Sequence, residues 1–193
     1  MSDMERRGNA DKVRLFTGIA LTPEVREYVS GVSGSLSGEI DGVSWVPAEN
    51  LHVTLKFFGW CGREIVPGLA DAISEAAVYL PIELSIGGTC GFPSQGSARV
   101  IWVGARDTGG SIQAVHRVID RGAARLGIAG EKRSYSPHVT IGRAKKKPVR
   151  LPERLAGEAG VRLLLQVEEL VLYRSELKST GAEYSVVERI SAL

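Results

Sequence analysis

The sequence predicts an α+β fold in which a few helices cover sheets that are largely antiparallel. Strand-like and helix-like segments follow the order βαββα, then ββαβ, then two further strands. Strands that follow one another without a helix between them favour antiparallel pairing over a doubly wound parallel sheet. Gly accounts for 23 of the 193 residues, which is well above its average share of about 7% in proteins. So many glycines favour many turns over a helical bundle.

Five elements are predicted in the first eighty residues. They are a strand at 13–21, a helix at 23–36, a short extended segment at 43–46, a strand at 51–58 and a helix at 64–80. The strand segments are rich in β-branched and aromatic residues or alternate between apolar and polar positions. Thr22 and Pro23 are typical of a helix start. Gly59 is expected to end the second full strand, and Pro81 is expected to stop the second helix.

The rest of the chain continues the pattern with more strands and one more helix. We expect strands at 82–86, 99–103, 138–141, 161–173 and 184–190, a loop at 87–96 and a helix at 111–126. The helix places its apolar residues on one face and ends before Gly127. A turn at 179–181 separates the last two strands.

Length and composition predict one globular domain over residues 13–193, behind a disordered tail at residues 1–12. No apolar run approaches the roughly 18 residues that a membrane span needs, and the polar start does not resemble a signal peptide. Cys61 and Cys90 lack the spacing of a disulfide framework or a zinc site, so we expect reduced thiols, a cytoplasmic location and no metal.

Positive charge is concentrated in one part of the chain, although the net charge is only +2. The basic segment, residues 132–150, has no Asp or Glu and contains Lys132, Arg133, Arg143, Lys145, Lys146, Lys147 and Arg150. Such a segment suits contacts with the phosphates of a nucleic acid. It is equally typical of a solvated loop that keeps a protein soluble.

A short motif occurs twice and contains the candidate catalytic residues. His52-Val53-Thr54 and His138-Val139-Thr140 are each followed by an aliphatic residue, and they contain two of the three histidines. In a strand, residues i and i+2 face the same side, so each His points the same way as its Thr. Two such strands can place two imidazoles and two hydroxyls in one groove.

These groups suit phosphoryl transfer. An imidazole with a reference pKa of about 6.5 can act as base or acid near neutral pH, so one His can take a proton from the attacking oxygen while the other protonates the leaving oxygen. The alternative is that these are ordinary polar strand positions. His116 lacks the motif, and we interpret it as a solvated residue on a helix face.

The residues around both motifs resemble a known family. VSWVPAENLHVTLKFFG and YSPHVTIGRAKK resemble the two active strands of the RNA 2′,3′-cyclic phosphodiesterases, formerly called 2′-5′ RNA ligases, in the two-histidine (HxTx) phosphoesterase superfamily. The resemblance extends over residues 13–187. It implies two pseudo-symmetric lobes, with helices on their outer faces and an active cleft between them.

The resemblance also implies roles for individual residues. His52 is the expected proton donor, His138 the proton acceptor, and Thr54 and Thr140 hold the phosphate. Arg143 matches an arginine that often follows the second motif and is expected to bind phosphate, with a plain surface role as the alternative. Three further candidates for substrate binding are Tyr135, Phe57 and Lys145. The two aromatic residues could stack on a base or simply belong to the core.

The sequence therefore predicts hydrolysis of RNA 2′,3′-cyclic phosphate ends to 2′-phosphomonoesters, without a metal or other cofactor. The substrates would be such RNA ends or cyclic nucleotides, and we expect a monomer with no membrane contact. Two alternatives remain, namely 2′-5′ RNA ligation in the same groove and a non-catalytic module that binds RNA ends. A metal phosphodiesterase fits poorly, because neither motif contains the ligand spacing or the acidic residues of a metal site.

Overall fold

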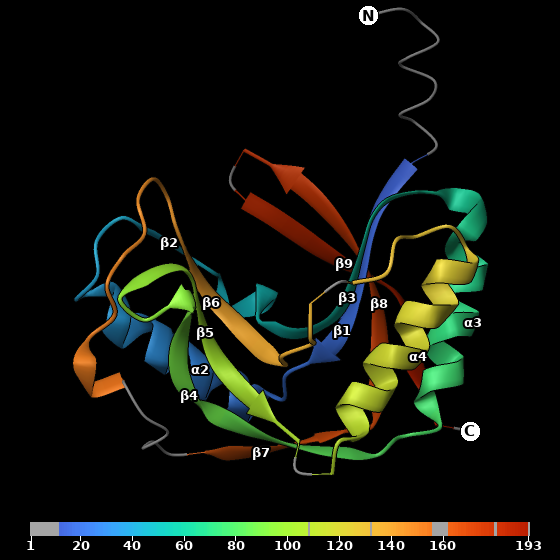
Figure 1. Ribbon diagram of the computed structural model, residues 1–193, viewed down its shortest axis with the longest axis horizontal. Helices are drawn as coiled ribbons and strands as arrows, with labels where there is room; N and C mark the ends of the chain where they lie inside the picture. The colour runs from blue at the N-terminus through green and yellow to red at the C-terminus, as the bar shows by residue number, and fades with distance from the viewer. Residues whose placement is uncertain (1–11, 108, 132, 156–161, 180, 193) are drawn as a thin grey trace, which may run out of the picture.

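A computed structural model describes residues 12–107, 109–131, 133–155, 162–179 and 181–192 (Figure 1). In this part of the chain, nine strands form one sheet in the order β7-β4-β5-β6-β3-β1-β8-β9, and β2 pairs with β6 off this path. All of these pairings are antiparallel. The sheet is accompanied by three α-helices, which confirms the predicted α+β class.

The elements have the following bounds. The strands are β1 Lys12–Ala20, β2 Val43–Trp45, β3 His52–Gly62, β4 Ile82–Ser94, β5 Ser97–Arg106, β6 His138–Ala144, β7 Leu163–Val167, β8 Glu169–Lys178 and β9 Gly181–Ser191. The helices are α2 Pro23–Ser37, α3 Val66–Ala77 and α4 Ser111–Arg125, with short 3-10 turns η1 Ala48–Asn50, η2 Arg63–Ile65 and η3 Glu153–Leu155.

The sheet has two halves that meet between β3 and β6. One half contains β3, β1, β8 and β9 and contacts α3 and α4, whereas the other contains β6, β5, β4 and β7 and contacts α2 (Figure 1). The chain crosses between the halves repeatedly, since β1 leads into α2 and β5 leads into α4. Each half contributes one of the two motifs, so the fold brings together two segments that are far apart in the chain.

Local sequence explains how α2 begins and which face it buries. The hydroxyl of Thr22 accepts a hydrogen bond from the backbone N–H of Val25 at 3.4 Å, and Pro23 occupies the first turn, as predicted. Val25 and Val29 are fully buried and lie one turn apart on the face that packs into the core.

Two strands are longer than the sequence predicts, because glycines sit in bulges and do not end them. β3 continues past Gly59 to Gly62, and Gly59 has a φ of +79° where the register with β1 shifts by one residue. β4 continues through most of the predicted loop 87–96 and has its own irregularity at Gly87 and Gly88. Glycine adopts the backbone of a bulge without steric cost, so a strand can continue through it.

The predicted strand 161–173 is wrong, because this segment forms parts of two strands in opposite halves. Residue 161 lies outside the described residues, β7 pairs with β4, and β8 pairs with β1 after an interruption at Glu168. The chain thus ends in three strands after β6, where two were predicted. Residues 1–11 of the predicted tail also lie outside the described residues, whereas Lys12 is the first residue of β1.

His116 is buried, at 7% exposure, and the solvated position predicted for it is wrong. Its ring stacks on that of Tyr135, with 4.3 Å between the ring centroids. The helical pattern of the sequence does not show this contact, because Tyr135 follows α4 in a loop that folds back over the helix.

Candidate active site

The two motifs lie side by side because β3 and β6 are antiparallel neighbours. Val53 and Val139, the central residues of the motifs, are direct partners in this pairing. Both valines are fully buried in the core, so the His and Thr that flank each of them face the opposite side of the sheet. Antiparallel register then places the His of each motif across from the Thr of the other.

The two histidines are held in the same way. Nδ1 of His52 lies 2.7 Å from the carbonyl oxygen of Asn50, and Nδ1 of His138 lies 2.7 Å from the carbonyl oxygen of Ser136. A carbonyl oxygen only accepts hydrogen bonds, so Nδ1 carries a proton in both rings. In the neutral rings Nε2 is therefore the basic nitrogen, and in His52 it lies 3.0 Å from the hydroxyl of Thr54.

Aromatic side chains fix the orientation of both imidazoles. The ring of His52 lies 4.8 Å from that of Phe16 and meets Tyr184 edge-on at 5.3 Å. The ring of His138 meets Phe92 edge-on at 5.3 Å and lies 5.7 Å from Trp102. These four residues come from β1, β9, β4 and β5 and were not predicted as site residues. No local pattern of the sequence connects them with the motifs, because they lie in four different strands.

Burial sets the protonation of the pair. It lowers the pKa of His52 below the usual 6.5, and the positive charges of His138 and Arg143 lower it further, against the hydrogen bond to Asn50. Burial likewise lowers the pKa of His138, with Arg143 acting in the same direction and the bond to Ser136 opposing it. Both imidazoles therefore lose a proton more readily than a solvated histidine, which favours one of them as a base.

A groove of about 540 Å³ lies against the first motif and is lined by His52, Thr54 and Thr140. Arg143 also lines it, as does Phe57, which is 44% exposed and has the guanidinium carbon of Arg14 4.4 Å from its ring centroid. Hydroxyls, the imidazole of His52 and arginines in one groove suit a phosphate, and the exposed ring suits a base beside it. His138 is not part of this lining and lies next to it, across from Thr54.

Two bulges explain why Phe57 and Arg143, each five residues after a motif His, reach this groove. An extra residue in β3 relative to β1, and another in β6 relative to β5, shifts the alternation of side chains by one position. The same shift directs the side chain of Lys56 into the protein interior. There its ammonium lies 2.6 Å from a carboxylate oxygen of Asp120 in α4.

The structure does not bring the other two predicted substrate-binding residues into the groove. The hydroxyl of Tyr135 donates to the carbonyl oxygen of Thr54 at 2.8 Å, so this side chain joins the loop before β6 to β3. Lys145 is exposed beyond the end of β6 and does not line the groove. Within the basic segment, Lys132 lies outside the described residues, and Arg143 is the described basic residue that lines the groove.

Neither cysteine is paired, since Cys61 and Cys90 are both free thiols. Among the described residues, no three His, Cys, Asp or Glu side chains are grouped so that they could hold a metal ion. No helix in the described parts of the chain is both long and apolar enough to cross a membrane.

Comparisons with known proteins give a consistent picture. Residues 25–178 match the profile of the 2′-5′ RNA ligase superfamily. An RNA 2′,3′-cyclic phosphodiesterase of Methanothermobacter thermautotrophicus is 33% identical over 181 residues, which cover 92% of this chain and 97% of the relative. A protein of the same name from Archaeoglobus fulgidus is 34% identical over 135 residues, which cover 70% of this chain and 74% of the relative.

Solved structures share the fold over nearly the whole chain. TT0787 of Thermus thermophilus has a TM-score of 0.79 and 29% identity, covering 92% of this chain and 97% of that one. LigT of E. coli complexed with 3′-AMP has a TM-score of 0.77 and 25% identity, covering 94% of this chain and 98% of that one.

Proposed function

Because the chain belongs to the 2′-5′ RNA ligase superfamily, we propose that His52 and His138 catalyse the opening of RNA 2′,3′-cyclic phosphates to 2′-phosphomonoesters. The chain is an RNA 2′,3′-cyclic phosphodiesterase, the activity for which its relatives are named. The family resemblance assigns the donor role to His52 and the acceptor role to His138.

The reaction is an in-line displacement at phosphorus. Nε2 of His138 takes a proton from water as the water oxygen attacks the phosphorus atom. The bond from phosphorus to the ribose O3′ breaks, and O3′ takes the proton from Nε2 of His52. The antiparallel pairing of the two motifs supports the use of one imidazole as base and the other as acid, because the attacking and leaving oxygens lie on opposite sides of phosphorus.

Thr54, Thr140 and Arg143 stabilise the charge on the two nonbridging oxygens. Hydroxyl and guanidinium groups donate hydrogen bonds that strengthen as negative charge develops in the transition state. Phe57 offers its ring to the base of the terminal nucleotide, next to the phosphate site. The guanidinium of Arg14, 4.4 Å from that ring, adds positive charge at the same end of the groove.

The observation that carries this proposal is the pairing of Val53 with Val139, which puts both motifs on one face of the sheet. The test is to incubate the purified protein with an oligonucleotide that ends in a 2′,3′-cyclic phosphate and to determine the product by ³¹P NMR. A 2′-phosphate supports the proposal, and a 3′-phosphate contradicts the assigned leaving oxygen. Tight binding without turnover would favour the RNA-end binding module.

We also propose that the enzyme acts as a monomer, since one chain supplies both imidazoles and also the hydroxyls and arginines of the groove. Sedimentation equilibrium of the active protein tests this. A dimer that loses activity on dilution would contradict it.

A further inference from the structure

The two halves of the sheet have a short junction at the active site. β3 and β6 carry the two motifs, and in the part of the chain that the structure describes their register contains one partner pair, Val53 with Val139. By contrast, β3 is registered with β1 along the whole length of β1. The spacing of the two halves, and with it the distance between His52 and His138, therefore depends on further contacts across this junction.

Tyr135 makes such a contact. Its hydroxyl donates a hydrogen bond to the backbone carbonyl oxygen of Thr54 at 2.8 Å, which connects the segment before β6 directly to the first motif. The side-chain hydroxyl of Thr54 lies 3.0 Å from Nε2 of His52 and lines the groove. The bond from Tyr135 therefore fixes the backbone of a residue that itself contacts the imidazole of the first motif.

The residue after Tyr135 contacts the second motif. The carbonyl oxygen of Ser136 accepts the hydrogen bond from Nδ1 of His138 at 2.7 Å. Two consecutive residues thus hold the backbone of Thr54 on one side and the imidazole of His138 on the other. The peptide unit between them is planar and has fixed dimensions, so a short segment of this kind can set the distance between the two groups that it binds.

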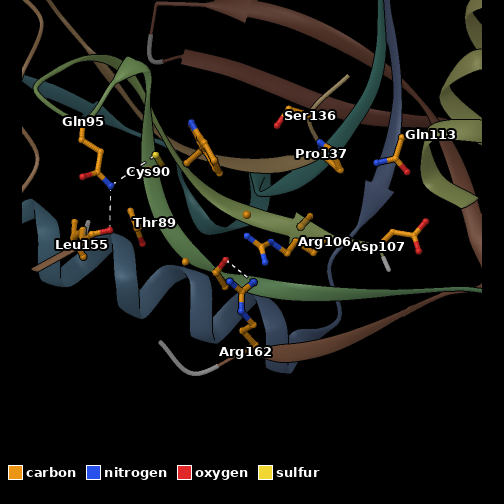
Figure 2. Close-up of a pocket in the computed structure, with 15 residues that line it drawn as sticks. Thr89, Cys90, Gln95, Arg106, Asp107, Gln113, Ser136, Pro137, Leu155 and Arg162 are labelled. Carbon is orange, nitrogen blue, oxygen red and sulfur yellow. Dashed lines mark hydrogen bonds between the residues drawn. The ribbon is translucent and has the colours of Figure 1, made fainter. Parts of the chain in front are cut away.

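The segment that contains Tyr135 has limited support from its own half of the sheet. Residues 134–137 have no regular secondary structure, and Ser136 and Pro137 line a cavity of about 370 Å³ beside β5 (Figure 2). Atoms that border a cavity lose packing contacts on that side. The carbonyl oxygen of Pro137 accepts a hydrogen bond from the backbone N–H of Ala105 at 3.2 Å, but β5 belongs to the same half as β6. That bond does not fix the segment relative to β3, whereas the bond from Tyr135 does.

The hydroxyl of Tyr135 is suited to this role at the pH of the reaction. Burial, together with the negative charge of Glu131, raises the pKa of Tyr135 above its usual value of 10. A carbonyl oxygen only accepts hydrogen bonds, so the tyrosine must keep its proton in order to donate. The bond therefore persists over the whole range in which the two motif imidazoles titrate.

We infer that Tyr135 is a positioning residue for catalysis, because its bond to Thr54 sets the distance between the two motif imidazoles. The inference rests on the proposed function, since it uses the base and acid roles assigned there. Acid and base groups act only within hydrogen-bond reach of the reacting oxygens, and a displacement of about 1 Å can lower the rate by up to about 10²-fold. Tyr135 does not line the groove, so it acts through the residues that do.

The test is Tyr135→Phe, which keeps the ring and removes the hydroxyl. With a 2′,3′-cyclic mononucleotide as substrate, kcat should fall by about tenfold, because the two imidazoles no longer keep one spacing. KM should change by less than about twofold, since the groups of Thr54, Thr140 and Arg143 that face the phosphate remain. The limbs of the pH–rate profile should stay at the same pH values, because the hydroxyl donates to a carbonyl oxygen and not to an imidazole.

Thr17→Val provides the matched control. Thr17 is fully buried in β1, and its hydroxyl donates to the carbonyl oxygen of Val171 in β8 at 3.0 Å. The variant therefore removes a hydrogen bond of the same kind, but within one half of the sheet. The urea midpoints of Thr17→Val and Tyr135→Phe should fall by similar amounts. Only Tyr135→Phe should lower kcat, which separates positioning from a general loss of stability.

Combining Tyr135→Phe with His52→Ala tests whether the spacing of the imidazoles is what the hydroxyl controls. An enzyme with one motif imidazole has no pair to hold at a fixed distance. In the His52→Ala background, the further loss in kcat caused by Tyr135→Phe should therefore shrink to less than about twofold.

Four outcomes contradict the inference. They are a Tyr135→Phe protein with wild-type kcat, a Thr17→Val protein with the same loss in kcat, a loss that persists at full size without His52, and a Tyr135→Phe protein that does not fold. The last would show that the bond maintains the fold and not the spacing. A wild-type enzyme that fails to open the cyclic mononucleotide would instead contradict the proposed function, and the inference would fall with it.

Discussion

Val53 of β3 and Val139 of β6 face each other in antiparallel register, and this pair lies at the centre of an approximate twofold arrangement of the site. His52 lies across from Thr140 and Thr54 lies across from His138, while each imidazole is bound through Nδ1 to a carbonyl oxygen two residues earlier in the chain. The arrangement supplies matched groups on two sides of one phosphate.

The pH dependence of the reaction should be displaced to the acidic side. Burial lowers the pKa of both His52 and His138 below 6.5, so each loses its proton at a lower pH than a solvated histidine. The productive enzyme needs one imidazole charged and the other neutral, and this form disappears as pH rises above the two pKa values. We expect kcat/KM to be bell-shaped with its maximum below about pH 6.5. A maximum above about pH 7.5 would contradict the prediction.

Arg143→Gln should move this bell toward higher pH. The positive charge of Arg143 lowers the pKa of both histidines, so its removal raises both values. The maximum value of kcat/KM should also fall by about tenfold or more, because the phosphate loses a charge-assisted hydrogen bond. A pH–rate profile of the variant separates these effects. An unshifted bell with a lower maximum would leave Arg143 as a phosphate ligand only.

The ion pair between the buried Lys56 and the partly exposed Asp120 should stabilise the fold behind the site. The ammonium of Lys56 is 1% exposed and lies 2.6 Å from Asp120, and it also donates to the carbonyl oxygen of Ala129. Asp120→Ala leaves this charge buried without its partner, and we expect the free energy of unfolding to fall by about 3 kcal/mol. Urea unfolding measures the loss.

Adding Lys56→Met to Asp120→Ala provides the control for that measurement. The double variant removes both charges, so it should recover much of the lost stability. If the double variant is as unstable as Asp120→Ala alone, the cost comes from packing and not from the unpaired ammonium.

Turnover should survive removal of divalent cations. Thr54, Thr140 and Arg143 can meet the charge on the phosphate, and the two imidazoles can carry both protons. We therefore expect dialysis against excess EDTA to leave kcat unchanged. Activity that is lost on dialysis and restored by a divalent cation would contradict the prediction.

The sequence was sufficient to predict the α+β class, the three helices and the two motifs, because each leaves a local pattern. The bulges leave none, so strand alternation alone could not show that Lys56 turns inward. Phe57 and Arg143, which do line the groove, were predicted from the family resemblance and not from that alternation. Bulges depend on the partner strand, as does the division of the segment after residue 161 into β7 and β8. The aromatic residues that hold the imidazoles come from four other strands, and only the sheet order brings them to the site.

The lysines of the basic segment should contribute to binding of longer RNA. Lys145, Lys146 and Lys147 are exposed beyond the end of β6. Changing all three to Gln should weaken binding of an oligonucleotide and reduce the slope of log Kd against log salt by up to about 2. Cyclic mononucleotides should be hydrolysed as before. Equal losses on both substrates would place these lysines at the reacting phosphate, and no loss on either would make them solubilising residues.

The sharpest prediction concerns the two histidines as one catalytic unit. General acid or base catalysis is typically worth roughly 10² to 10⁴-fold, so His52→Ala and His138→Ala should each lower kcat by at least that factor, with a smaller change in KM. Each variant should also lose one limb of the bell-shaped profile. His116→Gln changes the one histidine outside the two motifs, which lies in α4 and does not line the groove, so it is the matched control and should leave kcat little changed.

The double variant decides whether the imidazoles act together. Each takes or gives one proton of the same displacement, so an enzyme that lacks the base gains little from keeping the acid. The combined loss in kcat should therefore be far smaller than the product of the two single losses. Losses that multiply would show two independent contributions. A folded His52→Ala or His138→Ala protein with nearly wild-type turnover would exclude the two-histidine mechanism, and the groove would then be a binding site for RNA ends.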